Sequence, residues 1–260
     1  MMKNGRRRFA LVREIPDTFD RCIKPPDNPQ PINVHLARVQ HRRYCGALSE
    51  LGLELIILPG DNGCPDCVFV EDTAVVIGER AIITRPGAES RRDEVGAVRE
   101  ALTPYKQIVQ ILPPATIDGG DVLLTEDWLF VGLTERTNQE GFSQLEALLG
   151  ESHLRVVSIP MGRSLHLKTA CNYLGKGFMV VNYLDFDQDV FADFEIVRSD
   201  PSESSKLSFL VVEGSVLLPD DCPKTREEFE RRGWRTIAVD ASEIRKAQAG
   251  LTCMSILFEG

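Results

Sequence analysis

The chain has 260 residues, a formal net charge of −9, 43% apolar residues and 27% charged residues. These values are ordinary for a globular protein with one large domain or two small ones. The negative charge argues against non-specific binding to nucleic acids or acidic membranes. No apolar run approaches the length of a membrane span, and the run after Arg6-Arg7-Arg8 is too short for the apolar region of a signal peptide.

The cysteines indicate a reducing compartment. There are seven, an odd number, without a secretory signal, so we expect free thiols and a cytoplasmic protein. Cys64 and Cys67 form a single Cys-x-x-Cys pair, whereas a structural zinc site of this kind normally needs a second pair. A thioredoxin-like redox site needs a strand-to-helix context, and the residues after Cys67 favour a strand. We therefore expect no metal and no other cofactor.

The two ends of the chain carry similar apolar runs. The first, at 8–12, is predicted to be a strand, and a proline-rich loop at 24–31 follows it, which is typical of a segment that covers a functional site. Asn33 is predicted to cap a helix over 34–51, and a strand follows at 53–58. The last run, 253–258, reads as a buried strand that needs a partner at its edge, so we expect it to pair with 8–12.

Between these ends one order of elements recurs: a hairpin of two strands, a helix and a third strand. The predicted units are strands 69–77, 80–84 and 107–112 with a helix at 90–104; strands 122–125, 128–133 and 154–159 with a helix at 138–149; strands 171–174, 178–183 and 195–198 with a short helix near 187–193; and strands 207–212, 215–218 and 235–239 with a helix at 224–233. The fifth unit is divided between the two ends of the chain.

Recurrence at a fixed interval indicates a radial or solenoid array, and a unit shared by both ends indicates a closed ring. Asp72, Asp118 and His166 are 46 and 48 positions apart, and Cys253 follows His166 after 87, about two further intervals. We therefore predict one α/β domain over residues 1–260, a closed five-fold α/β propeller of ββαβ repeats. The alternative, an open doubly wound sheet, would have single parallel strands between helices. Nucleotide binding has no support, because neither GxGxxG nor a Walker A sequence is present.

Polar side chains occur near the start of four of the five predicted hairpins. They are Asp66, Glu71 and Asp72 in the first, Asp118 in the second, His166 and Lys168 in the third, and Cys253 in the fifth. In a closed ring these starts face a common axis, so we expect the side chains to meet there. Each alone has a plainer explanation: loop carboxylates, a glycine turn, a structural histidine or a small buried cysteine.

Together these residue types point to a particular chemistry. A cysteine, a histidine and a carboxylate that orients the imidazole are the parts of an activated thiol nucleophile. Additional carboxylates oppose the anionic intermediate of peptide hydrolysis but suit a cationic substrate. Carboxylates bind the planar guanidinium through paired hydrogen bonds, so a guanidinium compound is the predicted substrate class.

Five segments resemble the motifs of the dimethylarginine dimethylaminohydrolases, a family of the guanidino-group modifying (pentein) superfamily. They are Phe69-Val70-Glu71-Asp72, Asp118-Gly119-Gly120-Asp121-Val122-Leu123, Arg136-Thr137-Asn138-Gln139, His166-Leu167-Lys168 and Leu251-Thr252-Cys253. The resemblance covers nearly the whole chain and implies the five-fold α/β propeller. It also implies a hydrolase that converts asymmetric dimethylarginine and monomethylarginine to citrulline and the free amine, within arginine metabolism and nitric oxide regulation.

The resemblance further implies roles for individual residues. Cys253 would form a covalent thiouronium-type intermediate, His166 would protonate the departing amine and then activate water, and Asp118 would orient His166. The residues implied in substrate binding are Asp72 and Glu71 for the guanidinium, Arg91 and Arg136 for the α-carboxylate, Asp66 and the carbonyl of Ile23 for the α-amine, and Phe69 beside them.

Two rival functions remain open at this point: a deiminase acting on arginine or agmatine, and a catalytically silent guanidine-binding or scaffold propeller. Intact Cys, His and Asp residues disfavour the silent protein, and agmatine has no carboxylate for Arg91 and Arg136. Deiminases of the superfamily carry a carboxylate where this chain has Lys168, whose ammonium we expect to turn outward. We expect a small-molecule methylarginine partner, no nucleic acid or membrane, and either a monomer or a homodimer.

Overall fold

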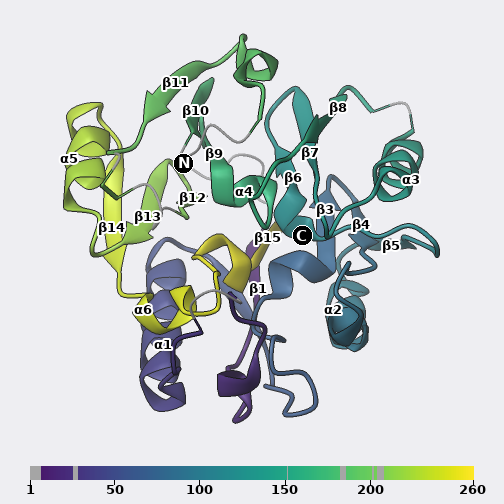
Figure 1. Cartoon of the computed structure of the whole chain (residues 1–260), viewed down its shortest axis with the longest axis horizontal. Coiled ribbons are helices and arrows are strands. Elements are labelled where there is room, and N and C mark those ends of the chain that lie inside the picture. Colours follow the sequence, from purple (N-terminus) through teal and green to yellow (C-terminus); the bar gives the residue numbers. More distant parts are fainter. Residues whose placement is uncertain (1–6, 26–28, 151, 182–185, 201, 204–207) are drawn as a thin grey trace.

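The computed structural model describes residues 7–25, 29–150, 152–181, 186–200, 202–203 and 208–260. In these residues the strands form five three-stranded sheets arranged around a common centre (Figure 1). In each sheet the first two strands pair antiparallel and the second and third pair parallel, with the second strand in the middle. A hairpin, helix and strand repeat produces this pairing, so the predicted five-fold α/β propeller is confirmed.

The sheets follow one another around the ring in chain order. Their strands are β3 (Ala74–Ile77), β4 (Arg80–Ile83) and β5 (Gln107–Gln110); β6 (Val122–Leu124), β7 (Trp128–Leu133) and β8 (Arg155–Pro160); β9 (Cys171–Gly175), β10 (Phe178–Val181) and β11 (Glu195–Arg198); β12 (Leu210–Val212), β13 (Ser215–Pro219) and β14 (Arg235–Val239); and finally β15 (Ile256–Glu259), β1 (Arg8–Arg13) and β2 (Glu54–Leu58).

The fifth sheet joins the two ends of the chain, as predicted. β1 pairs antiparallel with β15, which places Phe9 opposite Phe258, and it pairs parallel with β2 on its other side. The rings of Phe9 and Phe258 stack with their centroids 5.3 Å apart, and the Tyr105 ring lies 4.7 Å from that of Phe9. Stacked aromatic pairs of this kind add to the burial energy of the strands that carry them.

Longer helices lie around the outside of the ring (Figure 1). They are α1 (Val34–Glu50), α2 (Val95–Leu102), α3 (Gln139–Leu149) and α5 (Pro223–Arg231). The predicted cap of the first helix is confirmed, because the Asn33 side chain accepts the backbone N–H of Leu36 at 3.0 Å. Between β10 and β11 the connection contains the 3₁₀ turn Gln188–Phe191, which agrees with the prediction of a short helix there.

The elements nearest the ring centre differ from the predicted ones. The strand expected over 69–77 starts only at Ala74, because Val70–Thr73 forms a 3₁₀ turn in which the Thr73 hydroxyl donates to the Val70 carbonyl. The strand expected from Cys253 starts at Ile256, after the 3₁₀ turn Thr252–Met254. Equivalent turns precede β6, at Gly119–Asp121, and β9, at α4 (Leu167–Ala170). The polar residues of the motifs therefore lie on turns that lead into the sheets.

Other differences are smaller. The helix expected over 90–104 divides into α2 and the preceding 3₁₀ turn Glu89–Glu94, which carries the buried ion pair between Arg91 and Glu94. The short α6 (Ser242–Arg245), which has no clear periodic pattern, was not predicted. Residues 26–28 of the proline-rich loop, 182–183 of a predicted strand and 207 of another lie outside the described residues.

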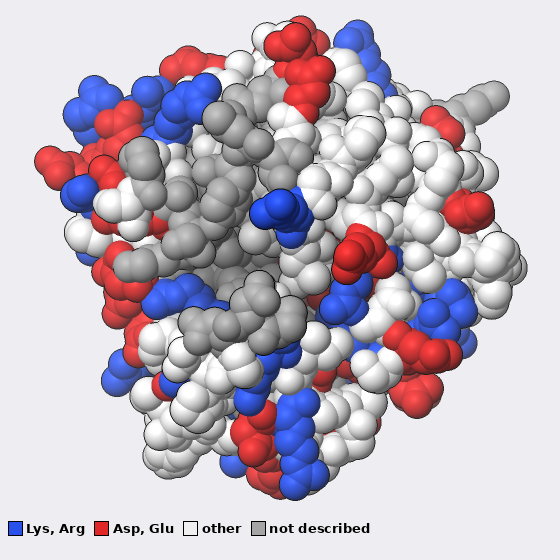
Figure 2. Space-filling model, in the orientation of Figure 1, with Lys and Arg blue, Asp and Glu red and all other residues white. Residues whose placement is uncertain are grey.

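The distribution of surface charge and the character of the helices relate to the prediction that the protein binds neither nucleic acid nor membrane. On the face shown in Figure 2, acidic and basic side chains of the described residues are interspersed and do not gather into one basic surface. Among the described residues, no helix combines the length and the apolar character that crossing a lipid bilayer requires.

Candidate active site

The turns that precede the sheets converge on a small cavity. The turns Gly119–Asp121 and Thr252–Met254 both contact Val70–Thr73, and α4 contacts Gly119–Asp121. The cavity between them has a volume of about 40 Å³ and is lined by Ile23, Asp66, Phe69, Asp72, Arg91, Asp118, Arg136, Leu165, His166, Ala247, Gln248, Ala249 and Cys253. Nine of the ten predicted site residues are therefore in one place, and Glu71 alone does not line the cavity.

His166 and Asp118 form a buried hydrogen-bonded pair. The imidazole Nε2 lies 3.0 Å from Asp118 Oδ2 and 4.0 Å from Asp72 Oδ1. The second carboxylate oxygen of Asp118 accepts the backbone N–H of Gly87 at 2.8 Å, so its orientation is fixed from both sides. Burial opposes a charge on His166, but Asp72, Asp121 and Asp118 outweigh it and raise the pKa of His166 to about 9. At neutral pH the imidazole is therefore a proton donor.

Gly120 allows the backbone to approach this pair closely. A Cβ atom at this position would lie 2.7 Å from His166 Nδ1 and 2.8 Å from Asp72 Oδ1, too near for any side chain. The backbone N–H of Gly120 instead donates to Asp72 Oδ1 at 3.0 Å. Gly120 of the Asp-Gly-Gly-Asp segment is thus required by the packing around the imidazole, beyond its use in a turn.

The Cys253 thiol lies in the same cavity. Its sulfur accepts the backbone N–H of Gly250 at 3.4 Å. Burial, reinforced by the negative charges of Glu71 and Asp72, raises the pKa of Cys253 to about 12. The thiol is therefore protonated at neutral pH, and a cation bound between the sulfur and the two carboxylates would favour the thiolate.

Arg91 is held by the protein itself. Its Nε and Nη2 donate to the Glu94 carboxylate at 3.1 and 2.8 Å, and Nη2 also donates to the Phe69 carbonyl at 2.9 Å. Its Nη1 donates to Asp72 Oδ2 at 2.6 Å. The second hydrogen on Arg91 Nη1 is then left for a ligand. Arg136 lines the same cavity from the loop that follows β7.

Ile23, in the loop that follows β1, contacts Asp66, in the segment that follows β2. The backbone N–H of Ile23 donates to the two carboxylate oxygens of Asp66 at 3.0 and 3.3 Å. Burial raises the pKa of Asp66, and the positive charge of Arg91 opposes that shift. The predicted proximity of these two residues is thus present in the structure, and the loop residue 23 lies at the cavity.

Lys168 does not turn outward, contrary to our expectation. Its Nζ lies 2.6 Å from Glu71 Oε1, and its side chain is only 16% exposed. The other oxygen of Glu71, Oε2, is buried and has no hydrogen-bond partner among the described residues. Burial raises the pKa of Glu71 and the charge of Lys168 lowers it, so the cation stabilises a carboxylate that would otherwise be buried without a counter-charge.

Sequence reasoning missed several residues of the site. Leu165 and the segment Ala247-Gln248-Ala249 line the cavity, but they carry no charge or motif that would reveal them. Asp121 lies behind it, completely buried. Asp121 is the second aspartate of the Asp-Gly-Gly-Asp segment, but the motif alone does not indicate a separate role for it.

Asp72, Asp118 and His166 bring two carboxylate oxygens and one ring nitrogen within 4.8 Å of one another, a spacing that also suits a metal ion. The same three groups already have partners within the protein. Asp118 bonds to His166, and Asp72 bonds to Arg91 and Gly120. Each of the three groups is thus bonded to another of them, to Arg91 or to the backbone of Gly120.

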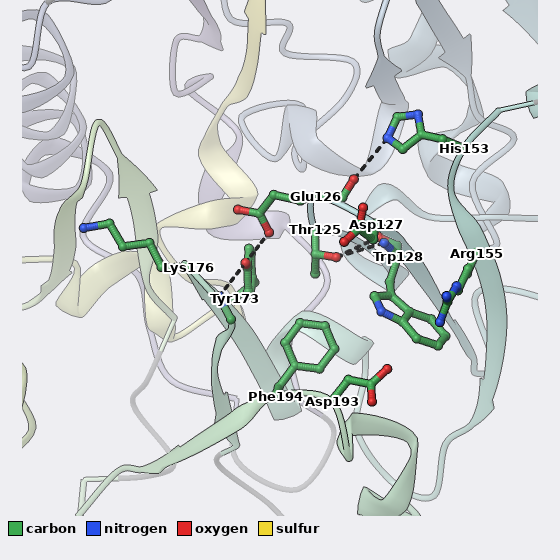
Figure 3. A pocket seen from close by; sticks show the side chains of 11 residues that line it. Thr125, Glu126, Asp127, Trp128, His153, Arg155, Tyr173, Lys176, Asp193 and Phe194 are labelled. Carbon is green, nitrogen blue, oxygen red and sulfur yellow. Dashed lines mark hydrogen bonds between the residues drawn. The ribbon is translucent and has the colours of Figure 1, made fainter.

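A second pocket, of about 730 Å³, is larger but has different chemistry (Figure 3). It lies between the turns of the second and third hairpins and carries no cysteine in its lining. The Tyr173 hydroxyl donates to the Glu126 carboxylate, and Thr125 Oγ1 accepts the backbone N–H of Trp128 at 3.0 Å. Because this lining offers no thiol nucleophile, we place the chemistry at the smaller cavity.

Comparison with known proteins agrees with this geometry. The family model described as N,N dimethylarginine dimethylhydrolase, eukaryotic, matches residues 11–198. The N(G),N(G)-dimethylarginine dimethylaminohydrolase of Streptomyces coelicolor is 38% identical over 248 residues, 95% of this chain and 95% of that protein. The enzyme of the same name from Pseudomonas aeruginosa is 36% identical over 221 residues, 84% of this chain and 87% of that protein.

The solved structures extend the similarity to three dimensions. A cysteine-to-serine mutant of DDAH from Pseudomonas aeruginosa, complexed with citrulline, matches with a TM-score of 0.90 and 32% identity. The match covers 96% of this chain and 98% of that one. The fold, the converging site residues and these matches agree, and the chain belongs to the dimethylarginine dimethylaminohydrolase family.

Proposed function

We propose that this protein hydrolyses N-ω-methylated arginines to citrulline and methylamine or dimethylamine through a covalent intermediate on Cys253. The observation that carries the proposal is a thiol, an imidazole bonded to a buried carboxylate, and further buried carboxylates in one cavity. The family to which the chain belongs, and the citrulline complex of its Pseudomonas aeruginosa relative, support the same reaction.

Substrate binding and thiol ionisation are coupled in this proposal. Asp72 and Glu71 attract the substrate guanidinium, and burial together with the charges of the same two carboxylates holds the pKa of Cys253 high in the free enzyme. When the cation neutralises them, loss of the thiol proton becomes easier. The nucleophile is then formed beside the guanidinium carbon that it attacks.

The reaction proceeds in two halves. The Cys253 thiolate adds to the guanidinium carbon, and His166 gives its proton to the methylated nitrogen as the C–N bond breaks, which releases the amine and leaves a thiouronium on the sulfur. Neutral His166 then takes a proton from water, and the hydroxide adds to the thiouronium carbon. The adduct then gives its hydroxyl proton to solvent as the C–S bond breaks, so that neutral citrulline leaves and the thiolate returns. Asp118 keeps the imidazole oriented in both halves.

The amino-acid end of the substrate meets the loop side of the cavity. We infer that Asp66 and the Ile23 carbonyl hold the α-amine, with Phe69 packed beside them, and that Arg136 binds the α-carboxylate. Arg91 contributes less to this contact than its position in the sequence suggested, since its donors are directed to Glu94, Asp72 and the Phe69 carbonyl. We further infer a single catalytic domain that acts in the cytoplasm on small molecules.

Citrulline release tests the proposal directly. Equal concentrations of asymmetric dimethylarginine, monomethylarginine, symmetric dimethylarginine, arginine and agmatine are each incubated with the wild-type protein. We expect turnover of the first two, little turnover of the symmetric compound, and none of agmatine. Arginine turning over as fast as the asymmetric form would favour the deiminase instead, and no turnover of any compound would favour a silent binding protein.

A further inference from the structure

Asp121 is completely buried behind the cavity, and its two carboxylate oxygens connect three segments of the chain. Its Oδ1 accepts the backbone N–H of Leu167 at 2.9 Å. Its Oδ2 accepts the hydroxyls of Thr134 at 2.8 Å and Thr137 at 2.6 Å. Asp121 itself does not line the cavity, so its contacts are with the protein alone.

Each of the three contacts leads directly to a residue of the site. Leu167 follows His166 in the chain, so a bond to its N–H holds the backbone that carries the imidazole. Thr137 Oγ1 accepts the backbone N–H of Asp118 at 3.1 Å. Thr134 Oγ1 accepts the backbone N–H of Arg136 at 3.0 Å.

We propose that Asp121 is a positioning residue that sets the places of His166, Asp118 and Arg136 relative to one another. The inference deepens the proposed function, because it assigns a common anchor to a proton-transfer pair and to a substrate-binding arginine. The Thr137 hydroxyl connects Asp121 to the backbone of Asp118, and the Thr134 hydroxyl connects it to the backbone of Arg136. Loss of the carboxylate therefore releases three site residues at once, although it touches none of the reacting atoms.

The packing around Asp121 allows little freedom. A Cβ atom at Gly132, on β7, would lie 3.0 Å from Asp121 Oδ1 and 2.9 Å from Leu167 Cβ, so a glycine is needed where the strand passes this bond. The fixed position also has an electrostatic effect. Burial raises the pKa of Asp121 to about 6, so it is ionised at neutral pH, and its charge acts with those of Asp72 and Asp118 on His166.

The test begins with Asp121→Asn, which keeps the volume and one acceptor oxygen but replaces the other with an amide nitrogen. We expect kcat to fall by up to about 100-fold, the effect of small displacements in a catalytic geometry. The matched control is Asp127→Asn, an exposed carboxylate in the turn between β6 and β7, which should leave kcat and KM at their wild-type values.

Two further variants test the connections through Thr137 and Thr134 separately. Thr137→Val removes the link to Asp118 and should lower kcat with little change in KM. Thr134→Val removes the link to Arg136 and should mainly raise KM. In the double variant Asp121→Asn/Thr137→Val the losses should not add, because both changes break the same connection. These variants also decide the matter if Asp121→Asn fails to fold.

A readout independent of turnover keeps this inference separate from the proposed function. The His166 imidazole is followed by NMR titration, identified by its loss in His166→Gln. Asp121→Asn should move its titration to lower pH, because one of the charges that favour the imidazolium is gone, and Asp127→Asn should not. If the wild type releases no citrulline, the function fails while this titration still tests the anchor. Wild-type kcat together with an unmoved titration in Asp121→Asn would overturn the inference.

Discussion

Lys168 Nζ lies 2.6 Å from Glu71 Oε1, so the residue two positions after the site histidine forms an ion pair with one of the carboxylates that act on the thiol. Only the Oε2 oxygen of Glu71 is then left without a partner among the described residues. A guanidinium with all its N–H groups, as in arginine, brings more donors to this site than a dimethylated one does, and each of them needs an acceptor. An unpaired buried donor costs about 1–3 kcal/mol. A dimethylated nitrogen has no N–H groups to leave unpaired.

From this ion pair we predict that asymmetric dimethylarginine is preferred over arginine by at least about tenfold in kcat/KM. Lys168→Met should reduce that preference, because Glu71 Oε1 becomes available to an unmethylated nitrogen. Lys176→Met, which changes an exposed lysine in the turn between β9 and β10, is the matched control. The measurement is citrulline release from both substrates, and an unchanged ratio in Lys168→Met would contradict the explanation.

Cys253→Ser should leave a folded protein whose turnover is lower by at least about 10³-fold, because a serine hydroxyl is a far weaker nucleophile at neutral pH. Circular dichroism checks the fold and citrulline release checks the activity. Cys45→Ser, which changes a partly buried thiol on α1, should retain wild-type turnover. A Cys253→Ser protein with a tenth of wild-type turnover would exclude Cys253 as the nucleophile.

Asp118→Asn should lower kcat with little change in KM, because Asp118 Oδ2 contacts the imidazole while its Oδ1 accepts the N–H of Gly87. An amide at this position favours the wrong tautomer of His166. Steady-state kinetics with asymmetric dimethylarginine separate the two parameters. A rise in KM at unchanged kcat would mean that Asp118 binds substrate and does not orient the histidine.

The two arginines of the cavity should behave differently. Arg136→Ala should weaken binding of the amino acid by about 1.5–3 kcal/mol, the value of a charge-assisted hydrogen bond, and should barely affect inhibition by a simple alkylguanidine. Arg91→Ala should instead destabilise the fold by about 3–5 kcal/mol, because it leaves Glu94 and Asp72 buried without their partner. Denaturant unfolding and KM measurements on both variants check this, and equal unfolding free energies would refute the distinction.

The stability of the protein should decrease in alkaline solution. The folded state raises the pKa of His166 from 6.5 to about 9, so it binds the proton more tightly than the unfolded chain does. This contribution is fully present below pH 6.5 and is lost as the pH rises through 9. Its size is on the order of 3 kcal/mol. Urea unfolding at pH 6 and pH 9 measures it, and His166→Gln should show a smaller difference between the two values.

The repeat and the site could be predicted because each unit carries its own hairpin turn and its own polar residue. Regular spacing from Asp72 to Asp118 to His166 identified the ring and its axis. The same patterns placed Phe69 and Cys253 in strands, because apolar runs do not distinguish a strand from a tight turn that leads into one. Only the contacts made by Thr73 and Asp72 determine where the strand begins.

Individual side-chain partners were less accessible to prediction. Lys168 was expected in solvent because lysine usually is, yet the buried charge of Glu71 draws it inward. Arg91 lines the cavity, but its ion pair with the buried Glu94, three residues later, was not predicted. In both cases a buried carboxylate sets the position of a cation, and the residue type of the cation alone does not reveal that partner.

The pairing of β1 with β15 gives the site a property that no single residue has. Arg8 and Glu259 are partners in this pairing although the rest of the ring lies between them in the chain. Contacts so distant in sequence form late in folding, because closing a long loop of unfolded chain costs conformational entropy that other contacts must first offset. Cys253 lies in the turn just before β15, so it joins His166 and Asp72 in the lining of the cavity only when the ring has closed. A partly folded chain would therefore carry an ordinary thiol, and appearance of turnover during refolding would report completion of the whole molecule.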